Sequence, residues 1–210
     1  MRPAAVNLGR LAFGLLILGE AILLGMVVVA GARYPGYDHS RQYISELGAT
    51  GAVDGWAVSW VGFLAVGTLT LAFCLIAAWL MRRSLLGVIG WLLLGLNAYA
   101  YLNSAWYRCE LECTGDTLAQ TMHNLLGALG YLAGCLGLLL AGLSAKGLRW
   151  LTLLGVACAA LVFFGLSGMG EGAEFRGLFQ RVTESAIAVF MLAFGWALAV
   201  GRVGEAAARP

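Results

Sequence analysis

Four side chains of the types used in nucleophilic catalysis lie in two short polar stretches of this chain. Ser45 and Glu46 belong to the stretch 38–48, and Asp116 and His123 follow much later in the sequence. A serine attacks an acyl group when a base within hydrogen-bond reach takes its proton and a third group orients that base. We therefore assign Ser45 as the candidate nucleophile or hydrogen-bond donor and His123 as the general base. Asp116 or Glu46 would orient the base.

Composition places these residues in an integral membrane protein. Of the 210 residues 61% are hydrophobic and 11% are charged, whereas a soluble domain is about 25% charged. A helix that spans a bilayer needs about 20 mostly apolar residues. Six stretches meet this requirement, approximately 11–31, 55–80, 85–106, 118–143, 150–168 and 182–200. We expect an all-α fold, a single six-transmembrane-helix bundle over residues 1–210. The net charge of +2 and the lack of a basic run exclude nucleic acid as a partner.

The distribution of Lys and Arg predicts the orientation. Eight basic residues lie on the side that carries the two termini and five lie on the other side. The positive-inside rule then places both termini in the cytoplasm of a multi-pass protein of the inner (cytoplasmic) membrane. The longer connections, about 32–54, 107–117 and 169–181, would face the periplasm or the extracellular side. Long loops on one face of a rigid scaffold commonly carry function.

The stretch 38–48 is expected to form a short helix of about two turns, because a turn signal precedes it and Gly48 fits the position after a helix end. Polar side chains would then share two faces, His39, Tyr43 and Glu46 on one and Arg41 and Ser45 on the other. The open alternative is an amphipathic cap over the bundle whose polar side is simply solvated.

Two further polar stretches begin the fourth and sixth expected helices. Thr114 or Asp116 would be the N-cap of the fourth helix, with His123 about two turns inside the membrane, where an ionisable residue indicates function by default. The alternative for His123 is a structural hydrogen bond between helices. In the stretch 171–184, Arg181 shares a face with Glu184 and suits a carboxylate or a phosphate group. The alternative there is an Arg–Glu pair that orders the loop.

Cys109 and Cys113 are the two cysteines in an outer connection, and an oxidising compartment favours a disulfide between them. A CxxxC metal site is the alternative, but with two histidines in the chain we assign no metal and no cofactor. Glu20 lies near the middle of the first helix. It would either bond to another helix, through Asn97 or Asn103, or belong to an ion path.

The segment Tyr43-Ile44-Ser45-Glu46-Leu47-Gly48, together with His123 and the pair Arg181 and Glu184, resembles the membrane family catalogued as domain of unknown function 998. This resemblance covers most of the chain and implies a six-helix bundle with an "ISELG"-type motif after the first helix. A looser resemblance is to the seven-helix ceramidase-like membrane hydrolases, which combine a serine, an aspartate and three histidines around zinc. This chain has two histidines and one expected helix fewer.

These observations predict a polar site on the outer face, at the boundary between membrane and water. The expected partner is a membrane lipid or isoprenoid-like amphiphile, which the protein binds and, in the enzymatic interpretation, hydrolyses or modifies. The candidate substrate-binding residues are His39, Arg41, Tyr43, Arg181 and Glu184. The alternative is a non-catalytic protein that supports a second copy or another membrane protein through a buried polar network. A small transporter is a more distant third.

Overall fold

The computed structural model describes residues 3–170 and 172–204, and this part of the chain is helical without strands. Arg2 and Arg209, two of the eight basic residues in the charge count, and Glu171 lie outside the described residues. The elements in chain order are α1 (Pro3–Arg33), η1 (Ser45–Gly48), α2 (Gly55–Ala57), η2 (Val58–Phe63), α3 (Leu64–Leu80), α4 (Leu85–Trp106), η3 (Leu111–Cys113), α5 (Leu118–Ser144), α6 (Arg149–Ser167) and α7 (Arg176–Ala199).

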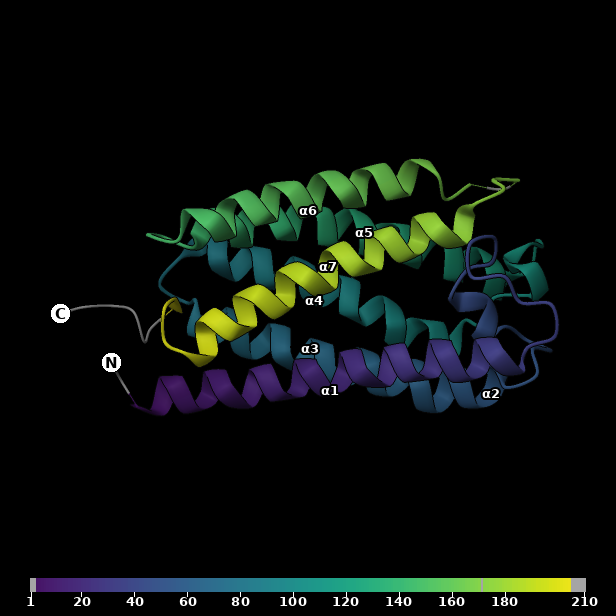
Figure 1. Ribbon diagram of the computed structural model, residues 1–210, viewed down its shortest axis with the longest axis horizontal. Helices are drawn as coiled ribbons and strands as arrows, with labels where there is room; N and C mark the ends of the chain where they lie inside the picture. The colour runs from purple at the N-terminus through teal and green to yellow at the C-terminus, as the bar shows by residue number, and fades with distance from the viewer. Residues whose placement is uncertain (1–2, 171, 205–210) are drawn as a thin grey trace.

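Six apolar helices are long enough to cross a membrane, so the predicted fold class is confirmed. They form a ring in which α1 packs against α3, α3 against α4, and so on through α5, α6 and α7 back to α1. The first turn of α1 and the last turn of α7 lie at one end of the bundle (Figure 1), here called the termini end. The connections 34–54 and 107–117 lie at the other end, here called the loop end.

The interior of the half of the bundle nearer the termini end is filled by aromatic rings. The Trp91 ring lies edge-on to Phe73 at 5.1 Å between centroids and to Phe194 at 5.0 Å, and Phe190 stacks beside it. All four side chains are fully buried. Lipid tails are as apolar as these residues, so close packing rather than hydrophobic transfer holds this part of the ring together.

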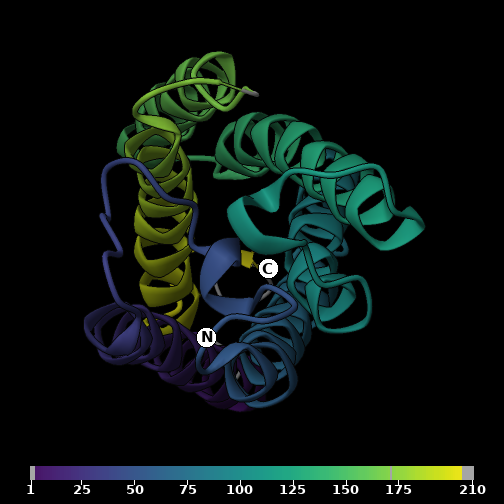
Figure 2. The ribbon, with the colours of Figure 1, turned by 90° about the vertical axis from the view of Figure 1, so that its right-hand side faces the viewer.

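The loop end is closed differently, by the connection 34–54, which folds back over the mouth of the ring (Figure 2). The prediction of a two-turn helix over 38–48 is wrong. Residues 38–42 form turns, and only η1, a single 3₁₀ turn, is helical. Ile44 and Leu47 are buried under the mouth of the ring. Because both side chains point into the bundle, the backbone follows a tight turn there and does not form a helix on the surface.

The second membrane span begins irregularly at the loop end. Its first turns are α2 and the π-helix η2, which run directly into α3. π-Helical turns are frequent at functional sites. Here the wide turn places the Ser59 hydroxyl 2.9 Å from the carbonyl of Gly48, to which it donates, and buries Phe63 against Gly48. A side chain at position 48 would collide with both residues.

The last helix also begins differently from the expected stretch at 182. α7 starts at Arg176, because the connection 34–54 binds its first turn. The backbone N–H of Leu178 donates to the carbonyl of Ser40 over 2.8 Å, and Gly177 lies directly against the backbone of Gln42. The N-cap of α5 is Thr117, whose hydroxyl accepts from the Gln120 N–H, and not Thr114 or Asp116.

Candidate functional site

A cavity of about 380 Å³ lies inside the loop end of the ring. Its walls come from residues 43–45, from the loop-end halves of α4, α5 and α7, and from the loop 113–115. The polar lining residues are Tyr43, Ser45, Asn97, Tyr101, Ser104, His123, Asn124, Tyr131, Arg176, Gln180 and Glu184. Apolar side chains, among them Phe63, Leu166 and Met169, complete the lining. The cavity is therefore amphipathic.

One wall is held by an ion pair between Glu46 and Arg176. The Glu46 side chain is fully buried, and its Oε1 accepts from Arg176 Nη2 at 3.2 Å and from the backbone N–H of Tyr43 at 2.9 Å. Gln42 Nε2 donates to the other carboxylate oxygen. A buried carboxylate is tolerated when it is paired and hydrogen-bonded in this way. Glu46 thus joins η1 to the start of α7 and is not directed at His123.

A second connection runs from η1 to the deep part of the cavity. The backbone N–H of Ile44 donates to Gln180 Oε1 at 2.6 Å, and Gln180 Nε2 donates to the Tyr131 hydroxyl at 3.1 Å. The Tyr131 hydroxyl in turn donates to the Glu184 carboxyl. This chain of hydrogen bonds links the loop, α7 and α5, and it places Glu184 in the cavity wall.

Arg181 lies on another face of α7 and is not among the cavity-lining residues. Its Nη2 donates to the Tyr37 hydroxyl at 2.8 Å and to His39 Nδ1 at 3.0 Å, and its Nη1 donates to the carbonyl of Gln42 at 2.9 Å. Because a guanidinium has no acceptor, His39 Nδ1 must accept and its proton lies on Nε2. Partial burial, reinforced by the charge of Arg181, lowers the pKa of His39, and burial raises the pKa of Tyr37.

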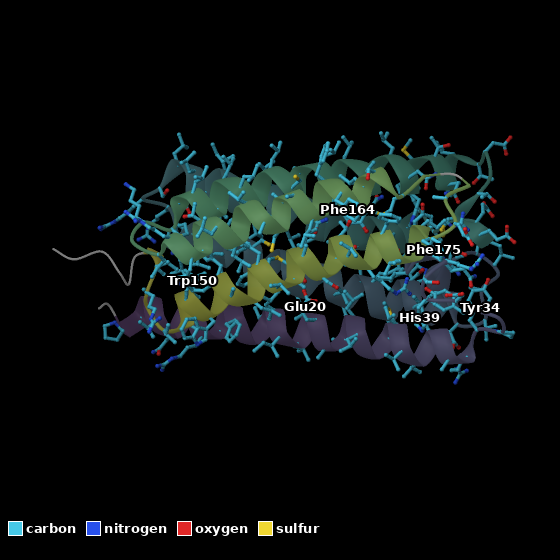
Figure 3. All side chains as sticks on the ribbon, turned by 45° about the horizontal axis from the view of Figure 1, so that its top comes forward. Glu20, Tyr34, His39, Trp150, Phe164 and Phe175 are labelled. Atoms are coloured by element: carbon cyan, nitrogen blue, oxygen red, sulfur yellow. A yellow bond between two sulfur atoms is a disulfide. The ribbon has the colours of Figure 1, made fainter. Side chains whose placement is uncertain are left out.

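The remaining candidate binding residues divide between the surface and the cavity. Arg41 is exposed and pairs with Glu174 at 2.7 Å, with Asp38 more distant at 3.7 Å. Tyr43 lines the cavity, and the Arg176 guanidinium lies 5.0 Å from the centroid of its ring. Figure 3 shows His39, Tyr34 and Phe175 toward the loop end, with Glu20 nearer the middle of the bundle.

Ser45 and His123 both line the cavity, but each has another nearest polar partner. The Ser45 hydroxyl lies 3.4 Å from Cys113 Sγ, and His123 Nδ1 lies 2.8 Å from the carbonyl of Tyr107. Since a carbonyl can only accept, Nδ1 of His123 carries the proton and Nε2 keeps a lone pair. Asp116 is exposed and precedes α5, so it does not share a helical face with His123.

The loop 107–117 brings two cysteines beside these residues. Cys109 and Cys113 are joined by a disulfide, with their Cα atoms 5.1 Å apart. A potential ligand atom of each cysteine and of His123 lies within 4.8 Å of the others, so the two thiolates and the imidazole could hold a metal only if the disulfide were reduced. Arg108 donates to the carbonyls of Gly48 and Ala49 and fixes this loop to the end of η1.

Glu20 lies on α1, half-buried within the membrane-spanning part of the bundle. Its carboxyl group interacts electrostatically with that of Glu184 on the neighbouring helix α7. Asn97 and Asn103, its expected partners, are both buried in α4, and Asn97 lines the cavity. The ring therefore contains two acidic groups at membrane depth, with Glu184 directly in the cavity wall.

Glu184 was a candidate binding residue and does line the cavity, but other cavity residues escaped the sequence interpretation. Arg176 and Gln180 precede Glu184 at intervals of four on α7 and face the cavity with it. The expected sixth helix began at 182, so the sequence pattern did not place Arg176 and Gln180 on the same helical face as Glu184. Tyr101 and Tyr131 lie inside apolar stretches, where a tyrosine is indistinguishable from a packing residue.

Six apolar helices around an amphipathic cavity define a multi-pass membrane protein. Residues 17–197 match the sequence family described as "Protein of unknown function (DUF998)", and the chain belongs to this family. No curated protein matches the chain, and neither does any solved structure.

Proposed function

We propose that the protein binds a single lipid-like amphiphile in the cavity at its loop end. The observation that carries this proposal is the amphipathic lining of a cavity of about 380 Å³ inside a ring of membrane-spanning helices. Binding sites for small molecules commonly enclose about 300–1,000 Å³ and combine apolar walls with a few polar groups. The polar lining would take a head group, and Phe63, Leu166 and Met169 would contact the beginning of an apolar chain.

The distribution of basic residues supports an orientation with the loop end outside the cytoplasm. Arg82 and Arg83 lie between α3 and α4, and Lys146 and Arg149 lie at the connection of α5 and α6, all at the termini end. These short loops are those to which the positive-inside rule applies. In this orientation the cavity opens at the periplasmic or extracellular side of the inner membrane and would receive an amphiphile from the outer leaflet.

The chain offers a matched pair of variants to test binding. Gly127 lines the cavity and Gly25 lies on the exposed side of α1, and an added side chain would meet open space at both positions. We expect Gly127→Leu to fill the cavity and Gly25→Leu to leave it unchanged. The measurement is native mass spectrometry of protein released from nanodiscs that contain a total lipid extract. Wild type and Gly25→Leu should each retain one amphiphile. Gly127→Leu should bind it at least about tenfold more weakly, which corresponds to about 1.4 kcal/mol in binding free energy.

Two results would overturn the proposal. One is the absence of any retained amphiphile in the wild type. The other is equal retention by Gly127→Leu and the wild type. An amphiphile whose binding does not change when a side chain occupies the cavity lies on the outer surface of the helices. In either case the polar network at the loop end would be better explained as the support of a second copy or of another membrane protein.

A hydrolytic or modifying reaction on the bound amphiphile is the second candidate. The observation that favours it is the presence of both Ser45 and His123 in the cavity wall, with the lone pair of His123 on Nε2. The contacts of a general base commonly tighten only when the substrate is bound. Untargeted lipidomics on cells that express the wild type, Ser45→Ala or His123→Ala tests it. The reaction is supported if the abundance of one lipid class changes when the wild type is expressed and does not change when either variant is expressed. Identical lipid profiles in all three cases reject it.

A further inference from the structure

Building on the proposed function, we infer that the head group in this cavity carries a protonated primary amine, with Glu184 as its counter-charge. This inference names the chemical class of the amphiphile. It also reverses the expectation, drawn from Arg181, that an anionic group is held here.

The charges around the cavity are the first reason. Arg176 is the arginine in the cavity wall, and it is already paired with the fully buried Glu46. A head group whose only charge is negative would therefore compete with Glu46 for the same guanidinium and would offer no cation to Glu184. Arg181, the residue expected to hold an anion, is engaged by Tyr37, His39 and the Gln42 carbonyl outside the cavity lining.

Glu184 is left without a cation. Its carboxyl accepts from the neutral Tyr131 hydroxyl, and among residues 3–170 and 172–204 it forms no ion pair. Its electrostatic neighbour on the adjacent helix α1 is Glu20, a second acid. An acidic group at membrane depth is expensive unless it is paired or neutralised. A cation brought by the ligand would supply the charge that the described residues do not.

Unused hydrogen-bonding groups beside Glu184 are the second, independent reason. The buried Tyr101 hydroxyl is within reach of the Glu184 carboxyl as a donor, but the contact falls outside ordinary hydrogen-bond geometry, and no described residue donates to the Tyr101 oxygen. The Asn97 side chain is buried in the same wall and likewise has no hydrogen bond among the described residues. Buried polar groups are almost always hydrogen-bonded, so the unused acceptor of Tyr101 and the unbonded amide of Asn97 point to a missing donor.

The numbers of donors and acceptors select a primary amine. A primary ammonium group donates up to three hydrogen bonds and accepts none. The Glu184 carboxylate, the Tyr101 oxygen and the Asn97 carbonyl oxygen are three acceptors in the lining of one cavity, with Asn97 and Tyr101 four residues apart on α4. The rings of Tyr101 and Tyr131 line the same cavity, and aromatic faces also attract ammonium groups. A trimethylammonium group could use the aromatic faces but could satisfy none of the three acceptors.

The experiment compares head groups on identical acyl chains. Wild-type protein in nanodiscs is titrated with dioleoyl phosphatidylethanolamine, its N-acetylated form, dioleoyl phosphatidylcholine and dioleoyl phosphatidylglycerol, and the bound lipid is counted by native mass spectrometry. We expect phosphatidylethanolamine to bind at least about tenfold more tightly than each of the other three lipids. Because N-acetylation removes the charge of the amine and two of its protons, it isolates the proposed contact.

Three variants separate the role of the amine from a role in folding. Glu184→Gln should reduce the preference for phosphatidylethanolamine to less than about twofold while binding of the four lipids persists. Tyr101→Phe removes a hydroxyl whose contact with Glu184 falls outside ordinary hydrogen-bond geometry, so it should weaken the preference several-fold with little effect on the thermal midpoint. Glu174→Gln, an exposed acid at the same end that pairs with Arg41, is the control and should leave the preference intact.

The outcomes distinguish this inference from the proposed function. If the wild type binds phosphatidylglycerol or the N-acetylated lipid as tightly as phosphatidylethanolamine, the amine is not recognised, whereas amphiphile binding stands. If phosphatidylcholine binds as tightly as phosphatidylethanolamine, the aromatic faces rather than the three acceptors select the head group, and the primary amine is rejected. If none of the four lipids binds, the proposed function itself fails, and this inference fails with it.

Discussion

The two halves of the ring are built from the same helices but are held together by different forces. Toward the termini end, four aromatic rings fill the interior and contact one another through van der Waals packing: Trp91, Phe73, Phe190 and Phe194. At the loop end, the Glu46–Arg176 ion pair and a chain of hydrogen bonds line an open cavity. In a bilayer the outer surface of both halves meets the same lipid. The difference therefore lies inside the ring. The half that is filled by aromatic rings, here called the solid half, can hold the half that contains the cavity, here called the hollow half, in a fixed shape.

Replacement of the central ring of the solid half should have the largest effect. Trp91→Ala removes a fully buried side chain in contact with three other rings, and we expect a loss of about 3–5 kcal/mol in the free energy of unfolding. The measurement is denaturant-induced unfolding in mixed micelles. Lipid binding by the protein that remains folded should be unchanged.

The control at this position is Trp91→Phe. The indole N–H of Trp91 has no hydrogen-bond partner among the described residues, so its removal sacrifices no bond while ring packing is kept. Trp91→Phe should therefore cost much less than Trp91→Ala. A variant Trp91→Ala that folds normally yet loses its lipid would contradict the division of the ring into a supporting half and a binding half.

Removal of the ion pair should have the largest effect on the hollow half. Glu46→Ala leaves Arg176 without its partner and exposes the Tyr43 N–H, and we expect a loss of about 3 kcal/mol, at the lower end of the range for buried pairs because Arg176 is partly exposed. Hydrogen exchange should increase at residues 40–48 and not around Trp91. The double variant with Glu46→Gln and Arg176→Gln removes both charges and should be more stable than Glu46→Ala. Equal or lower stability would show that the charge left on Arg176 is not what destabilises the single variant.

A smaller effect is expected where α7 contacts the connection 34–54 through a glycine. A methyl group at Gly177 would overlap the carbonyl of Gln42, so Gly177→Ala should displace the connection at a cost of about 1–3 kcal/mol. Lipid should dissociate faster, because residues 43–45 form one wall of the cavity. Gly25→Ala, which meets open space, is the control. Unchanged stability and unchanged dissociation in Gly177→Ala would mean that the connection is not a fixed wall.

The sequence was sufficient to predict the six-helix fold, because long apolar stretches report membrane spans directly. It also indicated that polar residues gather at one end. It could not predict which polar face of α7 lines the cavity, since the start of that helix depends on the N–H of Leu178 meeting the carbonyl of Ser40. The partner of Glu46 was hidden for the same reason. Arg176 is 130 residues away in sequence, and no local pattern selects it over Arg181.

The π-helical start of the second membrane span could not be predicted from the sequence for another reason. Val58–Phe63 is an ordinary apolar run, and its wide turn depends on the Ser59 hydroxyl reaching the carbonyl of Gly48 in a different segment. Tyr101 and Tyr131 are similar cases, because their roles come from Glu184 on another helix. Periodicity identifies a buried face of a helix, whereas the chemistry of that face depends on the neighbour that packs against it.

The smallest expected effect concerns pH at the surface of the loop end. Burial and the charge of Arg181 lower the pKa of His39, while Asp38 opposes them, so His39 binds fewer protons in the folded state than in the unfolded state. The contribution of His39 to stability is therefore complete above its ordinary pKa of about 6.5 and is lost as the pH falls below that value. Protonation also removes the acceptor of the bond from Arg181 Nη2.

We expect hydrogen exchange at residues 37–43 to increase between pH 7.5 and pH 5.5, after correction for intrinsic exchange rates, with little change around Trp91. His39→Gln keeps a neutral acceptor that does not titrate, and it should remove most of this pH dependence. An equal pH dependence in His39→Gln would assign the effect to another group at the loop end. A comparable increase around Trp91 would show that the two halves open together, and the solid half would then not be an independent support for the cavity.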